Sequence, residues 1–295
     1  MQAETQIQIK ESIEQYLADK QLSQNKLAAE IGINPATLSV MRKGGKPGHN
    51  VSDEMWRKVD AHVNPTGSSV RAINTRNLKA ITDLCDDARH NTRMLGISDF
   101  TGAGKTFALE RVSRQPNTYY VLTTCLMTQK SFLMKVARSM GLRIHGTKEQ
   151  VLEAIVEQLN ADNAPLLILD DFGKVRDNVY RMLQLIYDST QGRCGIVVAG
   201  VENLKRYIHR CRDRSKMGFA EMSRRIEYWL PLHRPSRKEV TMIARLHGIE
   251  DKRAHDYLNN RTKDFGTLNA LITNARRAVG EQPITVEALI HTKVD

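Results

Sequence analysis

Hydrophobic and polar positions divide the chain into a first part with helical periodicity only and a second part in which short apolar runs alternate with amphipathic stretches. In the first part, apolar residues recur at helical spacing over residues 7–17, 24–31, 35–43 and 51–63. Residues 64–69 are polar, turn-forming and without apolar anchors, which is typical of a linker. We therefore predict a small all-helical domain over residues 1–63 and a linker over 64–70.

The apolar runs of the second part predict buried strands, at residues 94–97, 119–124, 166–169, 195–199 and 228–232. Helical stretches such as 131–140 separate these runs, which is typical of a mostly parallel sheet with crossovers on both faces. Beyond Pro235 the strands stop and three helical stretches follow. The sequence thus predicts an α/β core over residues 71–234 and an all-helical appendage over 235–295.

Residues 23–43 match the pattern of two helices joined by a tight turn. Ser23 is suited to cap the first helix, Gly32 to form the turn, and Pro35 to begin the second helix. The spacing resembles the helix-turn-helix of phage repressors, with a purely structural helical hairpin as the alternative. The outward face of the second helix offers DNA a mostly small polar set: Asn34, Ala36, Thr37, Ser39, Arg42 and Lys43. This face indicates DNA binding rather than a specific sequence, because only Arg42 suits guanine.

The run at 94–97 leads into a small-residue loop and then a helix that opens with Gly-Ala-Gly-Lys-Thr. Small residues let backbone N–H groups close around a polyphosphate, and the helix N-terminus adds the positive end of its dipole. Lys105 can then reach the β- and γ-phosphates of ATP, and the Thr106 hydroxyl can ligate Mg²⁺. Asp99 occupies the position of the motif's first glycine, and we expect its carboxylate to point away. The predicted contacts are Thr101, Gly102, Ala103, Gly104, Lys105, Thr106 and Phe107, with a glycine-rich turn of no function as the alternative.

Two carboxylates, Asp170 and Asp171, follow the apolar run at 166–169, at the end of the strand where α/β sheets place ligands. We assign Asp170 to hold Mg²⁺ through water, and Asp171 to orient and activate the attacking water. Cleavage of the γ-phosphate usually needs a further cation from a neighbour. Arg224 or Arg225, just before the fifth strand, is suited to supply it, with a surface basic pair as the alternative.

In this order and over nearly the whole chain, these motifs resemble the AAA+ ATPases, and among them the transposition ATPases of Mu-like phages. The resemblance implies a P-loop NTPase core with a five-stranded parallel sheet and a helical lid. It also implies nucleotide contacts at residues 101–106, metal and water roles for Asp170 and Asp171, and an arginine finger at Arg224 or Arg225.

The chain departs from the family pattern at three positions, of which the first is Asp99 in place of the first glycine of the loop. The second acid is the shorter Asp171 where the family usually has Glu, so we expect slow hydrolysis. The lid motif at 266–269 reads Gly-Thr-Leu-Asn and lacks its usual arginine, which leaves Arg276 or Arg277 as candidates. Asn203 is the nearest candidate for the polar sensor after the fourth strand.

The chain carries 44 Lys and Arg against 33 Asp and Glu, a formal charge of +11. This excess predicts a polyanionic partner, double-stranded DNA before an anionic membrane, with a solvated basic surface as the alternative. Candidate DNA contacts outside the first domain are basic residues near strand ends or in the densest basic run: Lys130, Lys174, Arg176, Lys205, Arg206 and Arg210. The scattered cysteines and the lack of a long apolar run predict no zinc site, no disulfide framework, no membrane partner and a cytoplasmic location.

Together these observations predict an ATP- and Mg²⁺-dependent ATPase that binds DNA with little sequence preference, assembles on it as a homo-oligomer or helical filament, and captures it for a transposase. DNA or the transposase would stimulate its hydrolysis of ATP. Two alternatives remain open from the sequence. One is an AAA+ replication-helicase loader, and the other is a nucleotide-sensing helix-turn-helix repressor.

Overall fold

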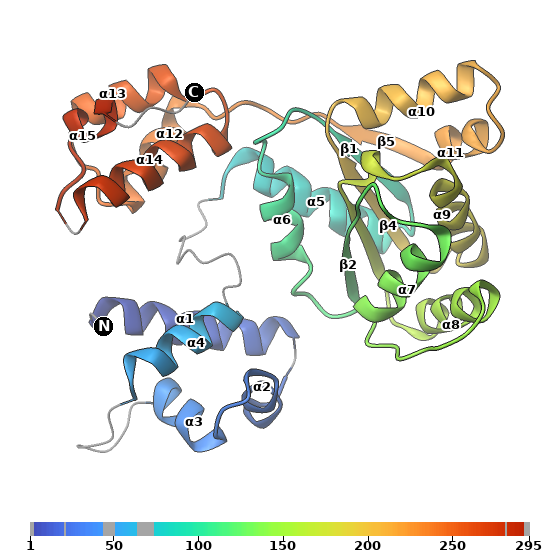
Figure 1. The fold of residues 1–295 in the computed structure, drawn as a ribbon, viewed down its shortest axis with the longest axis horizontal. Helices are drawn as coiled ribbons and strands as arrows, with labels where there is room; N and C mark the ends of the chain where they lie inside the picture. The colour runs from blue at the N-terminus through green and yellow to red at the C-terminus, as the bar shows by residue number, and fades with distance from the viewer. Residues whose placement is uncertain (1–2, 21, 44–50, 64–73, 281, 292–295) are drawn as a thin grey trace. The chain divides into compact units, whose positions relative to one another are not determined.

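The computed structural model describes residues 3–20, 22–43, 51–63, 74–280 and 282–291, and Figure 1 shows its elements. Helices α1 to α4 form one compact unit, here the N-terminal unit, and the elements from α5 to α15 form a second, here the sheet unit. The predicted linker over 64–70 lies outside the described residues. Within the described part of the chain, no helix combines the length and apolar character that crossing a bilayer requires.

The N-terminal unit consists of α1 (Ala3–Lys20), α2 (Gln24–Ile31), α3 (Pro35–Lys43) and α4 (Asp53–Val63). Ser23 caps α2, since its Oγ accepts a hydrogen bond from Lys26 N at 3.3 Å, and Gly32 ends that helix with a φ of 70°. The four helices share one buried cluster that includes Ile13, Leu27, Leu38, Met41, Trp56 and Val59. The helices lie where the hydrophobic spacing predicts them, because the residues that set the period are also those that pack.

Five parallel strands form the sheet: β1 (Met94–Ser98), β2 (Thr118–Leu122), β3 (Leu166–Asp170), β4 (Gly195–Gly200) and β5 (Ile226–Leu230). Their order is β2-β3-β4-β1-β5, so β4 lies between β1 and β3. The predicted bounds of the last strand, 228–232, are wrong at both ends. Pairing with β1 starts at Ile226, and on an edge strand the exposed Glu227 is tolerated even though it interrupts the apolar run.

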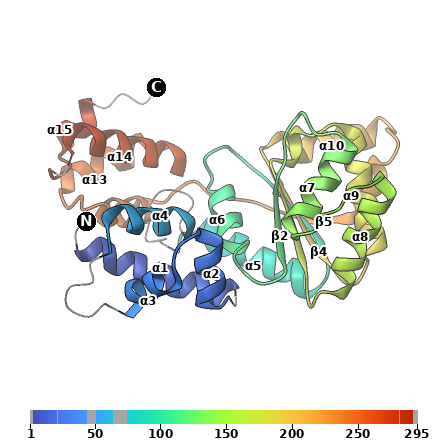
Figure 2. The same cartoon turned by 60° about the horizontal axis from the view of Figure 1, so that its bottom comes forward.

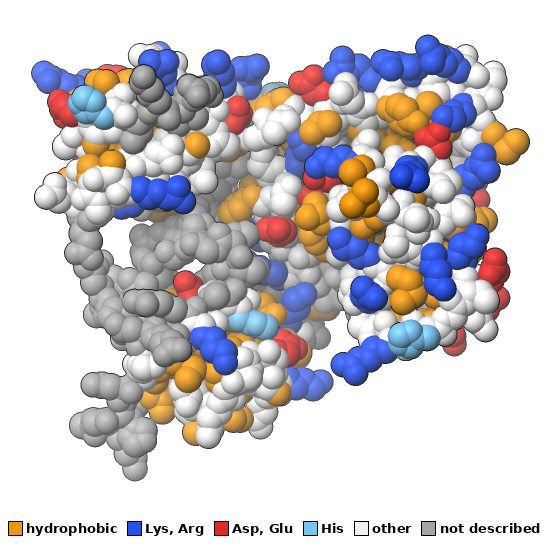
Figure 3. Space-filling view, viewed as in Figure 1, with side chains coloured by type: hydrophobic (Ala, Val, Ile, Leu, Met, Phe, Trp, Pro, Cys, Tyr) orange, Lys and Arg blue, Asp and Glu red, His pale blue; other side chains and the backbone are white. Residues whose placement is uncertain are grey.

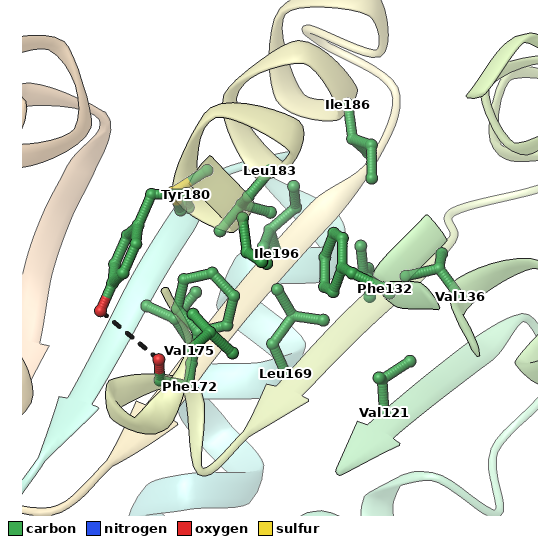
Figure 4. Packing of buried hydrophobic residues seen from close by; sticks show 14 of the residues in the cluster. Val121, Phe132, Val136, Leu169, Phe172, Val175, Tyr180, Leu183, Ile186 and Ile196 are labelled. Carbon is green, nitrogen blue, oxygen red and sulfur yellow. Dashed lines mark hydrogen bonds between the residues drawn. The ribbon is translucent and has the colours of Figure 1, made fainter. Parts of the chain in front are cut away.

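Helices cover both faces of the sheet (Figures 1 and 2). One face carries α5 (Arg76–His90) and α6 (Lys105–Val112), which contact its strands. The opposite face carries α7 (Gln129–Ser139), α8 (Lys148–Ala161), α9 (Asp177–Ser189), α10 (Asn203–Asp213) and α11 (Phe219–Arg225), whose buried residues join one hydrophobic cluster. Figure 4 shows the centre of this cluster, where Phe172 lies between Phe132 and Tyr180 and the Tyr180 hydroxyl donates to Phe172 O at 3.4 Å.

The C-terminal part of the sheet unit is helical, as predicted, but its described residues form four helices rather than three. These are α12 (Arg237–Leu246), α13 (Lys252–Arg261), α14 (Phe265–Val279) and α15 (Val286–His291). They bury a core of their own that includes Val240, Leu258, Leu271, Ile272 and Leu289. The sequence prediction gave no bounds for its three stretches and had one helix too few. The last helix, α15, is six residues long and buries Leu289 alone, so its apolar residues show no period.

Candidate nucleotide-binding site

The segment between β1 and α6 forms a tight loop whose two glycines adopt left-handed backbone conformations. Gly102 has a φ of 82° and Gly104 a φ of 85°, a region that favours glycine over any residue with a Cβ. Gly104 is the N-cap of α6, so the unbonded N–H groups of the first helical turn face the loop. This arrangement suits an anion with several oxygens.

Asp99 and the buried Asn77 hold this loop from outside. The Asp99 carboxylate accepts hydrogen bonds from Phe100 N at 2.8 Å and from Leu232 N at 2.7 Å. Its acceptor oxygens are therefore engaged with backbone groups, in agreement with the prediction that Asp99 does not face the phosphate site. Asn77, which sequence reasoning missed, donates to Ala103 O at 3.0 Å and to His233 O at 2.8 Å. Its only signal in the sequence was a polar residue on the inward face of a helix.

Lys105 is the first residue of α6 and folds back over the loop. Its Nζ donates to Asp99 O at 2.9 Å and to Phe100 O at 2.7 Å, and the residue is only 8% exposed. Burial lowers the pKa of Lys105, and the charges of Asp99, Asp170, Asp171 and Glu202 oppose that shift. The lysine thus lies in a partly dehydrated site, where a single positive charge interacts strongly with an anion.

Asp170 and Thr106 are brought together at the end of the sheet where the strands terminate. All five residues of β3 are buried, and Asp170 is its last residue, 1% exposed. Thr106 Oγ1 donates to Asp170 Oδ2 at 2.7 Å, and Asp171 N donates to Asp170 Oδ1 at 2.8 Å. A hydroxyl beside a carboxylate provides the oxygen ligands that Mg²⁺ prefers, so these two residues fit the predicted metal role.

Asp171 follows with a positive φ of 57° and is partly exposed. Its Oδ2 accepts a hydrogen bond from Lys174 Nζ at 2.6 Å, within the 3₁₀ turn Phe172–Lys174. Lys174, predicted to contact DNA, therefore pairs with the carboxylate that was predicted to activate water. The sequence predicts separate roles for the two residues and does not predict the turn that brings them together.

Comparison with known proteins agrees with this geometry. Residues 88–208 match the family model of the AAA domain. These residues therefore have the fold of an AAA domain. The chain is also 21% identical, over 88% of its length and 92% of the relative's, to the Mu-like prophage FluMu DNA transposition protein B of Haemophilus influenzae.

Two solved structures align with this chain. The Orc1 protein of Aeropyrum pernix, solved in complex with DNA, aligns with a TM-score of 0.52 and 14% identity over 72% of this chain. The chain spans 63% of the Orc1 length. The RuvB Holliday junction branch migration motor of Thermotoga maritima aligns with a TM-score of 0.47 and 16% identity, over 74% of this chain and 68% of RuvB. At these identities the Orc1 match shows the fold alone.

The C-terminal helices touch the nucleotide loop of the AAA domain through the start of α14. Phe265 N donates to Gly102 O at 3.0 Å. Asp264 caps α14 by accepting from Thr267 N at 2.8 Å, and a Cβ placed on Gly102 would lie 2.3 Å from Asp264 Oδ1. The acidic residue Asp264 therefore lies beside the loop at the start of α14.

Arg276 and Arg277 were the candidates for a lid arginine. They lie about three turns along α14 from the end that contacts the loop. The Arg276 guanidinium donates to the carbonyl groups of His247 at 2.9 Å and Gln282 at 2.9 Å, which argues against this role for Arg276. Asn203, the candidate sensor, is the exposed first residue of α10 and follows β4 at the same end of the sheet as the loop.

Arg224 and Arg225 lie at the opposite end of the sheet, where the strands begin. They end α11 directly before Ile226, which pairs with Met94 at the start of β1. Arg225 binds Asp188 through two hydrogen bonds of 2.9 and 2.7 Å, which argues against its assignment as an arginine finger. The exposed Arg224 side chain makes no hydrogen bond or ion pair with any described residue.

The predicted DNA contacts differ in whether an internal partner already engages them. Arg42 binds Glu14 through bonds of 2.6 and 2.7 Å and also donates to Gln24 Oε1 at 2.9 Å, so the one guanine-reading candidate is held inside its own unit. Asn34 Oδ1 accepts from Ala36 N at 2.8 Å and caps α3. Lys43 is exposed, whereas Thr37 and Ser39 are half-buried.

On the AAA domain, Lys and Arg side chains gather along α10 (Figure 3). Arg206 pairs with Glu202 at 3.2 Å, whereas the exposed Lys205 and Arg210 side chains have no ion-pair partner among the described residues. Arg176 is the exposed N-cap residue of α9. Lys130, expected before a helix, lies inside the first turn of α7, because Thr128 caps that helix earlier than the apolar spacing indicates.

Proposed function

We propose that this protein is an ATP-dependent DNA-binding ATPase of a DNA transposition system, which assembles on DNA and presents it to a transposase. The observation that carries the proposal is the convergence of Lys105, Thr106 and Asp170 at one end of the sheet. At the other end lies Arg224, whose side chain has no partner in the described part of the chain. The name of the Haemophilus relative, a DNA transposition protein B, supports the biological setting.

The nucleotide site assigns a role to each residue in binding and hydrolysing ATP. Lys105, now bonded to two loop carbonyls, would turn to the β- and γ-phosphates of the bound substrate. Thr106 and Asp170 would hold Mg²⁺, which neutralises the charge that develops on the phosphates. Asp171 would orient the attacking water. Its ion pair with Lys174 competes for that carboxylate, which supports a slow basal rate.

Arg224 can act only on a nucleotide held by another copy of the chain. The loop follows the end of β1, whereas Arg224 precedes the start of the neighbouring parallel strand β5. Five strand residues, about 16 Å, separate the two ends. A contact in which the loop of one copy meets Arg224 of the next is heterologous and extends into a ring or a helical filament. ATP would thereby control assembly.

DNA binding rests on charge rather than on base recognition. The net charge of +11, the exposed Lys43 at the end of α3, and Lys205 and Arg210 on α10 offer cations to phosphates. Because Glu14 occupies Arg42, the exposed face of α3 has little with which to read a base edge. We therefore assign the protein a largely sequence-nonspecific mode of binding to double-stranded DNA, in the cytoplasm of a bacterial or phage-infected cell.

The proposal is tested by measuring DNA affinity and assembly with ATP, with ADP and without nucleotide. Filter binding on random duplexes and light scattering should both show assembly with ATP and Mg²⁺ only. Lys105→Ala should abolish this dependence, while Lys79→Ala, at an exposed lysine of α5, should not. Equal DNA affinity in all three states would refute the role of ATP.

Two other outcomes would identify the alternatives. A single palindromic footprint with negligible phosphate release would identify a nucleotide-sensing repressor. Stable binding to a replicative helicase without stimulation of strand transfer would identify a helicase loader.

A further inference from the structure

Asp170 has a third hydrogen-bond donor that the proposed roles leave unused. The Tyr120 hydroxyl donates to Asp170 Oδ2 at 3.0 Å, the same oxygen that accepts from Thr106 at 2.7 Å. With Asp171 N on Oδ1, donors engage both oxygens of the buried carboxylate. Tyr120 is half-buried, and it approaches Asp170 from a different strand.

The register of β2 against β3 explains this contact. Leu122 lies opposite Asp170, and Tyr120 lies opposite Ile168, so Tyr120 and Asp170 are diagonal neighbours on one face of the sheet. A diagonal pair is within reach of a long aromatic side chain. The adjacent Tyr119 points to the other face and donates its hydroxyl to Asp162 instead.

We propose that Tyr120 is a positioning residue that orients the Asp170 carboxylate for the Mg²⁺ ion of the nucleotide site. The inference rests on the proposed nucleotide site and adds a residue to it. A hydroxyl that donates its proton to Asp170, as Thr106 does, keeps its lone pairs for a metal. The donor from Tyr120 then prevents the carboxylate from turning away. Hydrogen bonds of this kind, one layer outside a metal, typically change metal affinity about 10- to 100-fold when they are lost.

The chemistry of a phenol is consistent with the donor role of Tyr120. A phenol hydroxyl is protonated across the neutral range, so the Tyr120 hydroxyl has a proton to donate to Asp170.

The test compares two substitutions that remove the same atom from neighbouring residues of one strand. Tyr120→Phe and Tyr119→Phe each break a bond from a tyrosine to an aspartate, but only the first touches Asp170. Free Mn²⁺ is measured by electron paramagnetic resonance during titration of the full-length protein with a non-hydrolysable ATP analogue. Nucleotide affinity in EDTA and the circular dichroism unfolding transition are measured alongside.

We expect Tyr120→Phe to weaken Mn²⁺ binding about 10-fold or more, with nucleotide affinity in EDTA unchanged. Its ATPase activity should return at high Mg²⁺, and Tyr119→Phe should match the wild type. Mn²⁺ affinity within twofold of the wild type in Tyr120→Phe, or equal losses in both variants, would overturn the role of Tyr120 alone. A wild-type protein that binds no analogue would overturn the nucleotide site as well.

Discussion

The N-terminal unit and the sheet unit each contain a helix that ends with two adjacent cationic residues. In each pair, one residue already binds a carboxylate of its own unit. At the end of α3, Glu14 binds Arg42 and leaves Lys43 exposed; at the end of α11, Asp188 binds Arg225 and leaves Arg224 exposed. The internal partner thus decides which cation is available to an outside anion.

The two regions differ in what the available cation is expected to contribute. Lys43 would meet one phosphate among many along a DNA duplex, where each contact adds a modest, salt-dependent increment. Arg224 would contact the γ-phosphate of ATP bound to a neighbouring copy, on which charge develops in the transition state. One arginine in that position changes the rate of ATP hydrolysis by orders of magnitude. Removal of the available cation is therefore expected to change DNA affinity slightly in the N-terminal unit and the rate of ATP hydrolysis strongly in the sheet unit.

The largest effect is expected from Arg224→Ala, which should lower DNA-stimulated hydrolysis by about 10³-fold or more. Arg225→Ala should retain activity within a few-fold, because it removes only the bond to Asp188. Mixing Arg224→Ala protein with Lys105→Ala protein should restore activity, since one partner supplies the loop and the other the arginine. Failure of the mixture to recover would contradict action between copies.

Gly102→Ala tests how the nucleotide loop differs from an ordinary turn. The new Cβ would lie 2.3 Å from Asp264 Oδ1, and moving Asp264 would sacrifice the cap of α14. We expect a loss of about 2–4 kcal/mol in the free energy of unfolding and about 10-fold or more in nucleotide affinity, from strain, clash and lost cap together. Gly141→Ala, with a φ of 76° and nothing within 4 Å, should show the backbone strain alone. Urea unfolding and nucleotide titration measure the two effects. If Gly102→Ala and Gly141→Ala lower stability and nucleotide affinity equally, a clash with Asp264 is excluded.

A smaller effect is expected where the occupied cation of the N-terminal unit is removed. Arg42→Met should destabilise that unit by about 0.5–1 kcal/mol, a modest figure because Glu14 is 55% exposed. Lys43→Met should instead leave stability unchanged and reduce the slope of log affinity against log salt by about 0.9. In a Trp229→Phe background, fluorescence of the buried Trp56 reports unfolding of this unit. A salt slope altered by Arg42→Met would show that Arg42 contacts DNA after all.

The smallest effect concerns pH. The hydrogen bond from Arg42 lowers the pKa of Glu14 below its ordinary value of 4.5. A lowered carboxylate pKa stabilises the folded state above the ordinary value, and this contribution disappears as pH falls through the folded value. The difference in unfolding midpoint between the wild type and Glu14→Gln should therefore be largest at neutral pH and vanish in acid. A difference that is constant with pH would rule out this ion pair as its source.

Elements that depend on local pattern could be predicted from the sequence alone. Apolar runs located the strands, and Ser23 located the start of α2, because both report which residues of a short segment are buried or terminate it. The glycine loop with Lys105 and Thr106 was readable for the same reason, since backbone conformation and helix start are set within a few residues. The number of C-terminal helices and the bounds of the edge strand β5 were predicted wrongly, because neither the short α15 nor β5 shows a clear period.

Which side chains face one another depends on how distant segments of the chain pack. Arg42 and Glu14 are 28 residues apart, Arg225 and Asp188 are 37 apart, and Tyr120 and Asp170 are 50 apart. No local period encodes such pairs, because they depend on which helices pack together and on the register of neighbouring strands. A sequence shows that two adjacent cations are present. The fold shows which of them already has a carboxylate.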